Sequence, residues 1–197
     1  MSHGAIPSPR HSPSGPAMAS CHCARMLILA NAALHVVRLL YFMAPAYAAN
    51  MAPPFVRYWK GWNRPLSRRW LGEHKTVIGL GLGVLAAVAV AFAQSRVPWS
   101  GALVSYHDWA GLGLRFGVGA MAGDALKSFA KRRCGIAPGA PWVPWDQLDF
   151  ALGALTLVWG RAPLAWVDVA TILVATVAGH VLVNHIGYWL GIRDVKW

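Results

Sequence analysis

Acidic residues are scarce in this chain, which has seven Asp and Glu residues against eighteen Lys and Arg residues. Charged residues of both signs make up 13% of the sequence, whereas 56% of it is hydrophobic, and the formal net charge is +11. A soluble domain needs a surface rich in charges of both signs. The shortage of acids therefore argues against an ordinary soluble domain and favours a membrane protein with basic edges.

Cysteine is also sparse, with residues at Cys21, Cys23 and Cys134. Three thiols do not make a paired disulfide framework, and the Cys-His-Cys run lacks the spacing and partner ligands of a zinc site. A dinucleotide-binding loop is missing too, because "GVGAMAGD" (residues 117–124) is one residue off the G-x-G-x-x-G spacing and no strand pattern precedes it. Metal-finger and Rossmann-type functions are thereby disfavoured.

Long apolar segments are what the sequence has in abundance. Those of roughly bilayer-spanning length lie near residues 26–49, 77–93, 109–130, 148–164 and 166–190. They predict an all-α integral membrane protein with about five transmembrane helices. Glycines four residues apart, Gly79 with Gly83 and Gly119 with Gly123, suit close packing of such helices.

The N-terminal region differs from the rest of the chain in composition. Residues 1–25 are rich in Pro, Ser, Gly and His and have no apolar period, which predicts a disordered tail. Residues 26–197 are predicted to form a single transmembrane domain. His35 and Arg38 interrupt the first apolar segment, so a retained helix is favoured over a cleaved signal peptide.

Basic residues are concentrated in alternate loops. The first loop holds Arg57, Lys60, Arg64, Arg68, Arg69 and Lys75, and the third holds Lys127, Lys131, Arg132 and Arg133. The second and fourth loops have one each, Arg96 and Arg161. Because short cytoplasmic loops carry the Lys and Arg excess, the N-terminus is predicted outside and the C-terminus in the cytoplasm. The protein is accordingly expected in the cell (inner) membrane, with its acidic loops facing the cytoplasm.

One helical face near the third basic loop combines both charges. Asp124, Lys127, Ser128 and Lys131 stand at i, i+3, i+4 and i+7, so they share one side of a helix. This face offers a carboxylate, a hydroxyl and two ammonium groups. A Gly/Pro-rich loop follows and could fold the next acidic site back onto it.

That next site is "WDQLDF" (residues 145–150), which has two interpretations. Asp146 and Asp149 could cap the fourth helix and suit its positive end. Alternatively, carboxylates suited to a hard cation, beside Lys and Arg suited to phosphate, form the combination used in phosphoryl and nucleotidyl transfer. Basic residues alone are equally typical of topology signals and anionic-lipid contacts.

Two more polar positions belong to the same predicted membrane face. Glu73 and Lys75 lead into the second helix, where Thr76 could cap and leave backbone N–H groups facing an anion. Asn50 ends the first helix, and the pattern leaves open whether it caps that helix or binds a ligand.

Four strings together resemble the CDP-archaeol synthase family, which is related to the CDP-diacylglycerol synthases. They are "PAYAAN" (45–50), "GEHKTVIG" (72–79), "GDALKSFAKRRCGIAPGAPWVPWDQLDFALGAL" (123–155) and "VNHIGYWLGIRDVKW" (183–197). The similarity covers about residues 38–197. One departure is Glu73-His74, which stands where the family usually has an acid followed by glycine before Lys-Thr.

The resemblance implies a magnesium-dependent membrane cytidylyltransferase. Such an enzyme transfers CMP from CTP to a lipid phosphate, archaetidic-acid-like or phosphatidic acid, and gives a CDP-lipid and pyrophosphate. Its implied partners are CTP, the lipid phosphate and membrane lipids, with no nucleic acid. The alternative interpretations are a non-enzymatic membrane scaffold with basic lipid-contacting loops, or a small transporter whose pathway includes Arg115 and His180.

The implied site residues follow from the same strings. Positions matching the family's polar motifs are Asn50, Lys75, Thr76, Asp124, Ser128, Lys131, Arg132, Asp146, Gln147 and Asp149. Asp124, Asp146 and Asp149 are expected to bind Mg2+ and, with Lys131, to act in catalysis. Lys127 joins the remaining positions as a residue expected to contact the nucleotide.

Overall fold

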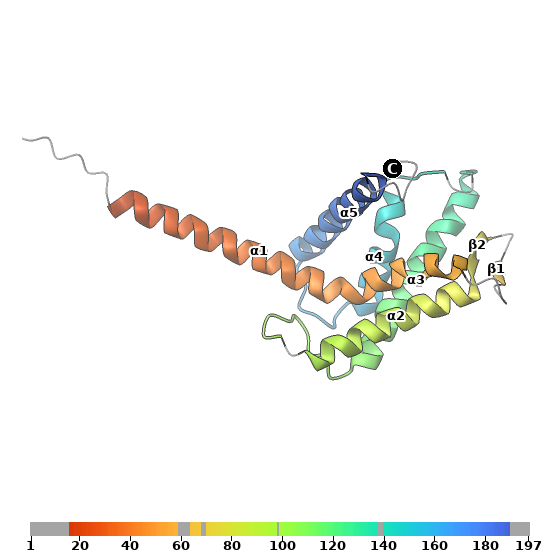
Figure 1. Cartoon of the computed structure of the whole chain (residues 1–197), viewed down its shortest axis with the longest axis horizontal. Coiled ribbons are helices and arrows are strands. Elements are labelled where there is room, and N and C mark those ends of the chain that lie inside the picture. The colour runs from red at the N-terminus through yellow and green to blue at the C-terminus, as the bar shows by residue number, and fades with distance from the viewer. Residues whose placement is uncertain (1–15, 59–63, 68–69, 98, 138–139, 190–197) are drawn as a thin grey trace, which may run out of the picture. The chain divides into compact units, whose positions relative to one another are not determined.

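The computed structural model describes residues 16–58, 64–67, 70–97, 99–137 and 140–189. This part of the chain is mostly helical (Figure 1). Its helices are α1 (Pro16–Met51), α2 (Val77–Arg96), α3 (Trp109–Arg133), α4 (Trp145–Val158) and α5 (Trp166–Trp189). The expected all-α class and the approximate positions of the five helices are confirmed.

Short elements connect α1 to α2. A 3-10 helix, η1 (Pro53–Tyr58), is followed by strands β1 (Pro65–Ser67) and β2 (Gly72–Thr76). The strands pair antiparallel, with Pro65 opposite Thr76 and Ser67 opposite Gly72. Thr76 ends β2 and is the N-cap residue of α2, since its hydroxyl accepts a 3.1 Å hydrogen bond from the Gly79 N–H. The predicted Thr76 cap is therefore confirmed.

Three helical segments in the described part of the chain are long and apolar enough to cross a bilayer: His22–Val56, Val77–Arg96 and Trp166–Ile186. α3 has 25 residues but carries charges along its length. α4 has 14 residues and extends about 21 Å, whereas the hydrocarbon core is about 30 Å thick. The predicted count of five membrane spans remains a prediction.

The chain divides into two compact units, Met1–His35 and Val36–Trp197. In the first, α1 begins at Pro16, ahead of the expected start near Met26. The apolar side chains at residues 26–29 are 60% to 68% exposed there. Exposed apolar surface of this kind suits lipid contact.

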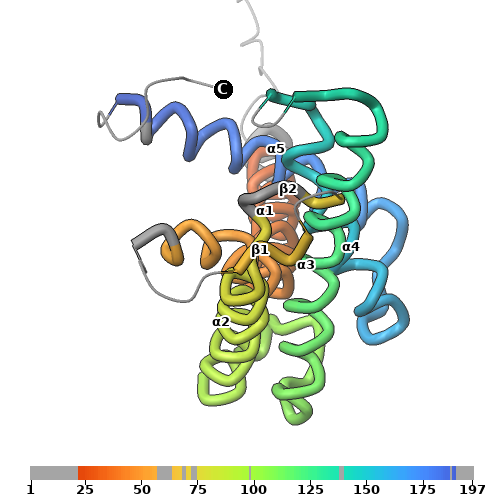
Figure 2. Tube along the Cα trace, turned by 90° about the vertical axis from the view of Figure 1, so that its right-hand side faces the viewer, coloured from red at the N-terminus to blue at the C-terminus, as the bar shows by residue number. Residues whose placement is uncertain are grey.

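In the second unit α3 packs against both α2 and α4, and Figure 2 shows it running beside them. Residues from these helices and from α1 form the buried core. Phe42 of α1 meets Phe116 of α3 edge to face, with ring centroids 5.1 Å apart, and both side chains are fully buried. Aromatic pairs of this geometry add about 0.5–1.5 kcal/mol beyond their buried area. The core of this unit thus fixes α2, α4 and the C-terminal part of α1 around α3.

Small residues allow these helices to approach closely. A Cβ atom on Gly117 would lie 2.8 Å from Val84 Cα of α2, and one on Gly119 would lie 2.8 Å from Ala154 Cα of α4. Gly123 faces the Asp149 carbonyl oxygen and Gly153 in the same way. The predicted packing role of Gly119 and Gly123 is therefore confirmed.

Candidate active site

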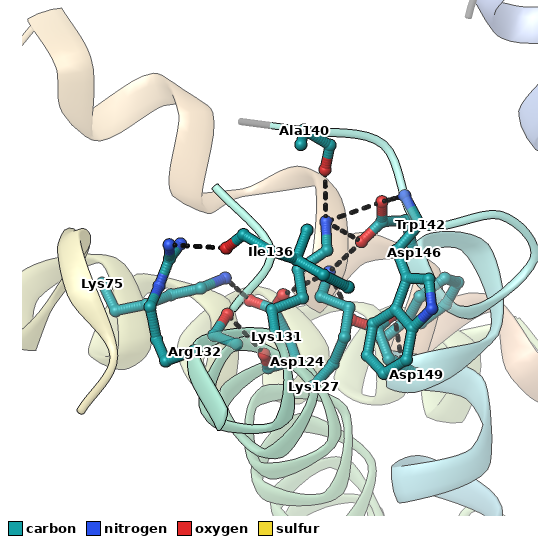
Figure 3. A network of polar contacts seen from close by, with 12 residues as sticks. Lys75, Asp124, Lys127, Lys131, Arg132, Ile136, Ala140, Trp142, Asp146 and Asp149 are labelled. Atoms are coloured by element: carbon teal, nitrogen blue, oxygen red, sulfur yellow. Dashed lines mark hydrogen bonds and ion pairs between the residues drawn. The ribbon is translucent and has the colours of Figure 1, made fainter. Parts of the chain in front are cut away.

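A polar network lies where the C-terminal half of α3 meets the start of α4 and the end of β2 (Figure 3). Its ion-pair cluster consists of Lys75, Asp124, Lys127, Lys131, Asp146 and Asp149. The α3 members share one helical face, as their spacing predicts. The cluster brings together three ammonium groups and three carboxylates, so its formal charges balance.

Lys127 is the centre of this cluster. Its Nζ atom lies 2.7 Å from Asp149 Oδ2, 3.2 Å from Asp124 Oδ1 and 3.3 Å from Asp146 Oδ1. The Lys127 side chain is 16% exposed and that of Asp149 is 5% exposed. Charges this buried are tolerated because they are paired, since an isolated buried ion is costly.

Lys131 joins Asp146 to the loop before α4. Lys131 Nζ lies 2.8 Å and 2.9 Å from the two Asp146 carboxylate oxygens and donates to the Ala140 carbonyl at 2.7 Å. The Trp142 backbone N–H donates to Asp146 Oδ2 at 2.6 Å. Partial burial alone would raise the pKa of Asp146, but the hydrogen bonds from Lys131 and Trp142 and the charge of Lys127 together lower it.

Lys75 brings the β-hairpin into the cluster. Its ammonium group forms an ion pair and hydrogen bond with Asp124 Oδ2. Lys75 and Thr76 are adjacent at the end of β2, so the strand places one on Asp124 and the other on the first turn of α2. The side chain of Glu73, the neighbouring acid in this string, lies outside the described residues.

Aromatic packing anchors the same hairpin to α3. The Trp70 ring lies 5.7 Å from the Phe129 ring. The Arg133 guanidinium lies over both rings, 5.1 Å from the Trp70 centroid and 5.3 Å from the Phe129 centroid. These contacts were not predicted from the sequence, because Trp70 has no periodic pattern that links it to α3.

The interpretation of Asp146 and Asp149 as helix caps is wrong. α4 begins after Pro144, which occupies the N-cap position and makes no side-chain cap hydrogen bond. Asp146 accepts its backbone hydrogen bond from Trp142 outside the helix, and Asp149 Oδ1 accepts from the Phe150 N–H at 2.7 Å. Both carboxylates instead face the lysines of α3.

Arg132 and Ser128 are near the cluster, but their side chains donate hydrogen bonds to backbone carbonyls within four residues of themselves. Ser128 Oγ donates to the Asp124 backbone carbonyl at 2.9 Å, and Arg132 Nη1 donates to the Ile136 carbonyl at 3.1 Å. Arg132 Nε is buried without a hydrogen-bond partner among the described residues. These contacts stabilise the end of α3 rather than the ion pairs themselves.

Gln147 and Asn50 complete the predicted set. Gln147 is buried, and its Oε1 atom has no hydrogen-bond partner in the described part of the chain. Asn50 is half-buried near the end of α1. Within the described residues, no hydrogen bond or ion pair joins Asn50 to the cluster, so its role in ligand binding stays a prediction.

The donor set of the cluster is chemically suited to a hard divalent cation. Mg2+ binds carboxylate oxygens, and Asp124, Asp146 and Asp149 all direct an oxygen at one point. That point holds the Lys127 ammonium, and no preassembled group of three acidic, His or Cys ligands occurs among the described residues. The residues fit a magnesium site in donor type, with the Lys127 ammonium at the point where the three carboxylates meet.

Two cavities differ in the charged residues that line them. One of about 60 Å3 lies beside the cluster and is lined by Lys75, Thr76 and Asp124 among others. A larger one of about 890 Å3 lies at the other end of α2, near Gln94 and Trp99, and no acidic residue lines it. Phosphoryl-type transfer needs cationic groups together with carboxylates that can hold a metal ion, and of these two cavities the one beside the cluster has both in its lining.

The residues that would serve a transport pathway have local partners. Arg115 Nη1 lies 3.8 Å from Asp108 Oδ2 and donates to the Gly111 carbonyl at 3.3 Å, at the start of α3. His180 and Asn184 are hydrogen-bonded at 3.3 Å, one turn apart on α5. Both side chains thus contact a residue of their own helical segment.

Comparison with known proteins gives a consistent match. The family model described as CarS-like, CDP-archaeol synthase, matches residues 32–197. The CDP-archaeol synthase of Methanopyrus kandleri is 41% identical over 172 residues, which cover 80% of this chain and 91% of that protein. The CDP-archaeol synthase of Halobacterium salinarum is 36% identical over 181 residues, covering 82% of this chain and 97% of that protein.

A solved structure is similar as well. It is described as giving structural insight into an intramembrane enzyme for archaeal membrane lipids biosynthesis. Its TM-score is 0.60 at 28% sequence identity, with 76% of this chain and 94% of that chain covered.

Proposed function

Since the chain belongs to the CDP-archaeol synthase family, and is therefore a CTP-dependent cytidylyltransferase of the membrane, we propose that its lipid substrate is an ether-linked isoprenoid phosphate. The products are then a CDP-activated ether lipid and pyrophosphate. Family membership replaces the scaffold and transporter interpretations with an enzyme. The ether-linked chains are supported by the activity named for the relatives.

The observation that carries the proposed nucleotidyl transfer is the alternation of Lys75, Lys127 and Lys131 with three aspartates at one end of the helices. Ammonium groups offset the charge of a triphosphate, and carboxylates hold the metal that accompanies it. No covalent enzyme intermediate is needed, because a lipid phosphate oxygen is itself an adequate nucleophile. The site has to orient two anions and stabilise their combined charge.

The bond changes are those of a single displacement. An oxygen of the lipid phosphate forms a bond to the α-phosphorus of CTP, and the bond from that phosphorus to the oxygen of the leaving pyrophosphate breaks. Lys75, Lys131 and Arg132 neutralise the triphosphate and the departing group. Mg2+ held by Asp124, Asp146 and Asp149 would supply further charge stabilisation when bound.

Five spans with a cytoplasmic active site form the second part of the proposal. The lysines and arginines around the cluster lie just before α2 and in the last turns of α3. These are the segments whose Lys and Arg excess predicts the cytoplasmic side. CTP is a cytoplasmic nucleotide and would reach the cluster from that side. The lipid chains would lie along the exposed apolar faces of the helices.

A radiolabelled-CTP incorporation assay tests the proposed reaction. Detergent-purified protein is given Mg2+ and either an ether-linked isoprenoid phosphate or phosphatidic acid. We expect label in the lipid fraction with the ether lipid, and at least about tenfold less with phosphatidic acid. Equal use of both lipids would refute the proposed lipid preference, and no incorporation with either would refute the reaction.

Aspartate variants test the assigned site. Asp149→Asn and Asp146→Asn should lower kcat about 100-fold or more, because a charge contact in the transition state is lost. Asp108→Asn is the matched control. Asp108 caps α3 from outside the cluster, and Asn is an equally good cap, so turnover should be near normal. Near-normal turnover of Asp149→Asn would remove that residue from the site.

A further inference from the structure

Lys127 differs from the other two lysines of the cluster in the number of carboxylates that it contacts. Its Nζ atom is within 3.3 Å of an oxygen from each of Asp124, Asp146 and Asp149. Lys131 reaches Asp146, and Lys75 reaches Asp124. Asp124 and Lys127 come from α3 and the other two aspartates from α4, so one ammonium joins the two helices.

Burial makes this ammonium necessary in the absence of another cation. The four side chains are between 5% and 24% exposed, so water screens their charges poorly. Carboxylates this close to one point repel each other unless a positive charge lies between them. Lys127 supplies that charge from within the chain.

We propose that Lys127 occupies the cation position between Asp124, Asp146 and Asp149, and that its ammonium must leave these carboxylates before they can bind Mg2+. The released ammonium then contacts the triphosphate of the nucleotide. This inference rests on the proposed function for its nucleotide step. Its metal step rests on the positions of Lys127 and the three aspartates and on the proposal that these carboxylates bind Mg2+.

Competition follows from distances. Mg2+ binds oxygen at about 2.0–2.1 Å, whereas the ammonium nitrogen lies 2.7 Å to 3.3 Å from the same oxygens. A Mg2+ ion bound by these carboxylates would therefore overlap with the ammonium group, so the two cannot be there at the same time. The flexible four-carbon stem of lysine allows the ammonium to move while remaining near the site.

Coupling between the two ligands is the functional consequence. Metal binding sets Lys127 free to contact the triphosphate, so each ligand should strengthen the binding of the other by the same factor. A lysine with a purely structural role behaves differently. Its removal would weaken the binding of the metal and of the nucleotide together, whereas competition predicts opposite signs for the two.

The first experiment measures Mn2+ binding to the full-length, detergent-purified protein without nucleotide, from the electron paramagnetic resonance signal of free Mn2+. Lys127→Met removes the ammonium with little change in side-chain length, and Mn2+ should bind about tenfold more tightly, which is about 1.4 kcal/mol. Lys131→Met is the matched control. It removes the same charge from the same cluster but contacts a single aspartate, so the gain should be about threefold or less.

Two results would overturn the competition. An equal gain in Lys131→Met would show a general charge effect rather than occupation of the metal position. Weaker Mn2+ binding by Lys127→Met would show that the lysine only holds the carboxylates in place. Size-exclusion profiles and thermal unfolding of each variant establish that folded protein is compared.

Lys127→Arg keeps the proposal testable if Lys127→Met does not fold. A guanidinium forms stronger, two-pronged pairs with carboxylates than an ammonium does. It should be harder to displace, so Mn2+ should bind about threefold or more weakly than in the unchanged protein. Lys131→Arg should bind Mn2+ about as tightly as the protein without substitutions does. If Lys127→Arg also bound Mn2+ with that same affinity, the proposal would be contradicted.

The second experiment measures CTP binding at saturating Mg2+ without lipid phosphate, so that no turnover occurs. Lys127→Met should bind CTP about tenfold more weakly, opposite in sign to its effect on Mn2+. Unchanged CTP affinity would refute the transfer of the ammonium to the triphosphate. If the unchanged protein does not bind CTP, the proposed function fails, while the Mn2+ result still decides the competition.

Discussion

At the scale of residues, Asp146 and Asp149 illustrate what sequence reasoning can and cannot decide. Their nearness to the basic face of α3 was expected, because the loop between α3 and α4 could fold the two sites together. Their role was ambiguous, since a cap and an ion pair use the same carboxylate at the same spacing. Pro144 at the N-cap position and the lysines opposite α4 decide it.

The individual pairings could not be predicted either. Asp124, Lys127 and Lys131 share a face by their spacing, but which lysine meets which aspartate depends on how far α4 is shifted along α3. Asp149 lies one turn deeper than Asp146 and is 5% exposed against 24%. The deeper carboxylate therefore meets Lys127, and the shallower one is shared with Lys131.

Asp146 also gives a prediction on pH. Its pKa is lowered below the ordinary value of 3.8, so the folded chain binds this proton more weakly than the unfolded chain does. The stabilisation by Asp146 should be complete above about pH 5 and be lost as the pH falls through the lowered pKa, below about 4. The difference in Tm between the unchanged protein and Asp146→Asn, measured in detergent, should be constant from pH 8 to 5 and shrink below pH 4. A difference that disappeared between pH 7 and 5 would contradict this.

At the scale of elements, the helices were predictable because each is a long apolar segment bounded by charge or by Gly and Pro. α2, α3 and α5 begin at or close to their expected residues. α4 begins at Trp145 and ends at Val158, instead of covering 148–164. The expectation was wrong there because apolarity continues into the loop after α4, and hydropathy alone does not show where a helix ends.

The β-hairpin was not predicted. Strands of three and five residues are too short to show an alternating pattern, and "GEHKT" is polar throughout. The hairpin is nevertheless the element that places Lys75 on Asp124. Its attachment to α3 depends on Trp70, which is 42% exposed and packs against Phe129 and Arg133.

Trp70→Ala should therefore weaken CTP binding without touching the reacting groups. Loss of the ring pair and the cation–π contact costs about 1–2 kcal/mol, which corresponds to a rise in the KM for CTP of about 5- to 30-fold. The kcat should change little, and Trp70→Phe should restore most of the affinity. Steady-state kinetics at varied CTP concentration measure KM and kcat separately. A fall in kcat with an unchanged KM would exclude this positioning role.

At the scale of the whole molecule, composition was informative because a bilayer restricts where charge can lie. An apolar chain with few acids has to gather its charged groups at helix ends and in loops. Six of them meet in the ion-pair cluster. The sequence could therefore indicate which charged residues gather in this cluster, whereas contacts between helices determine its geometry.

The native cysteines offer a test of the proposed orientation. Cys134 is exposed at the end of α3 beside the cluster, and Cys23 is exposed on α1. With the N-terminus outside, a membrane-impermeant maleimide should label Cys23 in intact cells and Cys134 only after permeabilisation. A Cys134→Ser variant, and a variant with Cys21→Ser and Cys23→Ser together, separate the two signals. The reverse pattern would invert the topology.

The glycine contact between α3 and α4 has a consequence for the spacing of the site. Gly123 immediately precedes Asp124 and lies against the backbone carbonyl of Asp149, with Gly153 next to it. The two carboxylates are thus carried on helices that touch through bare backbone, one step along the chain from the cluster. The separation of Asp124 from Asp149 therefore depends on the absence of a side chain at position 123, and even the Cβ of an alanine there would force the two helices, and with them the two carboxylates, apart.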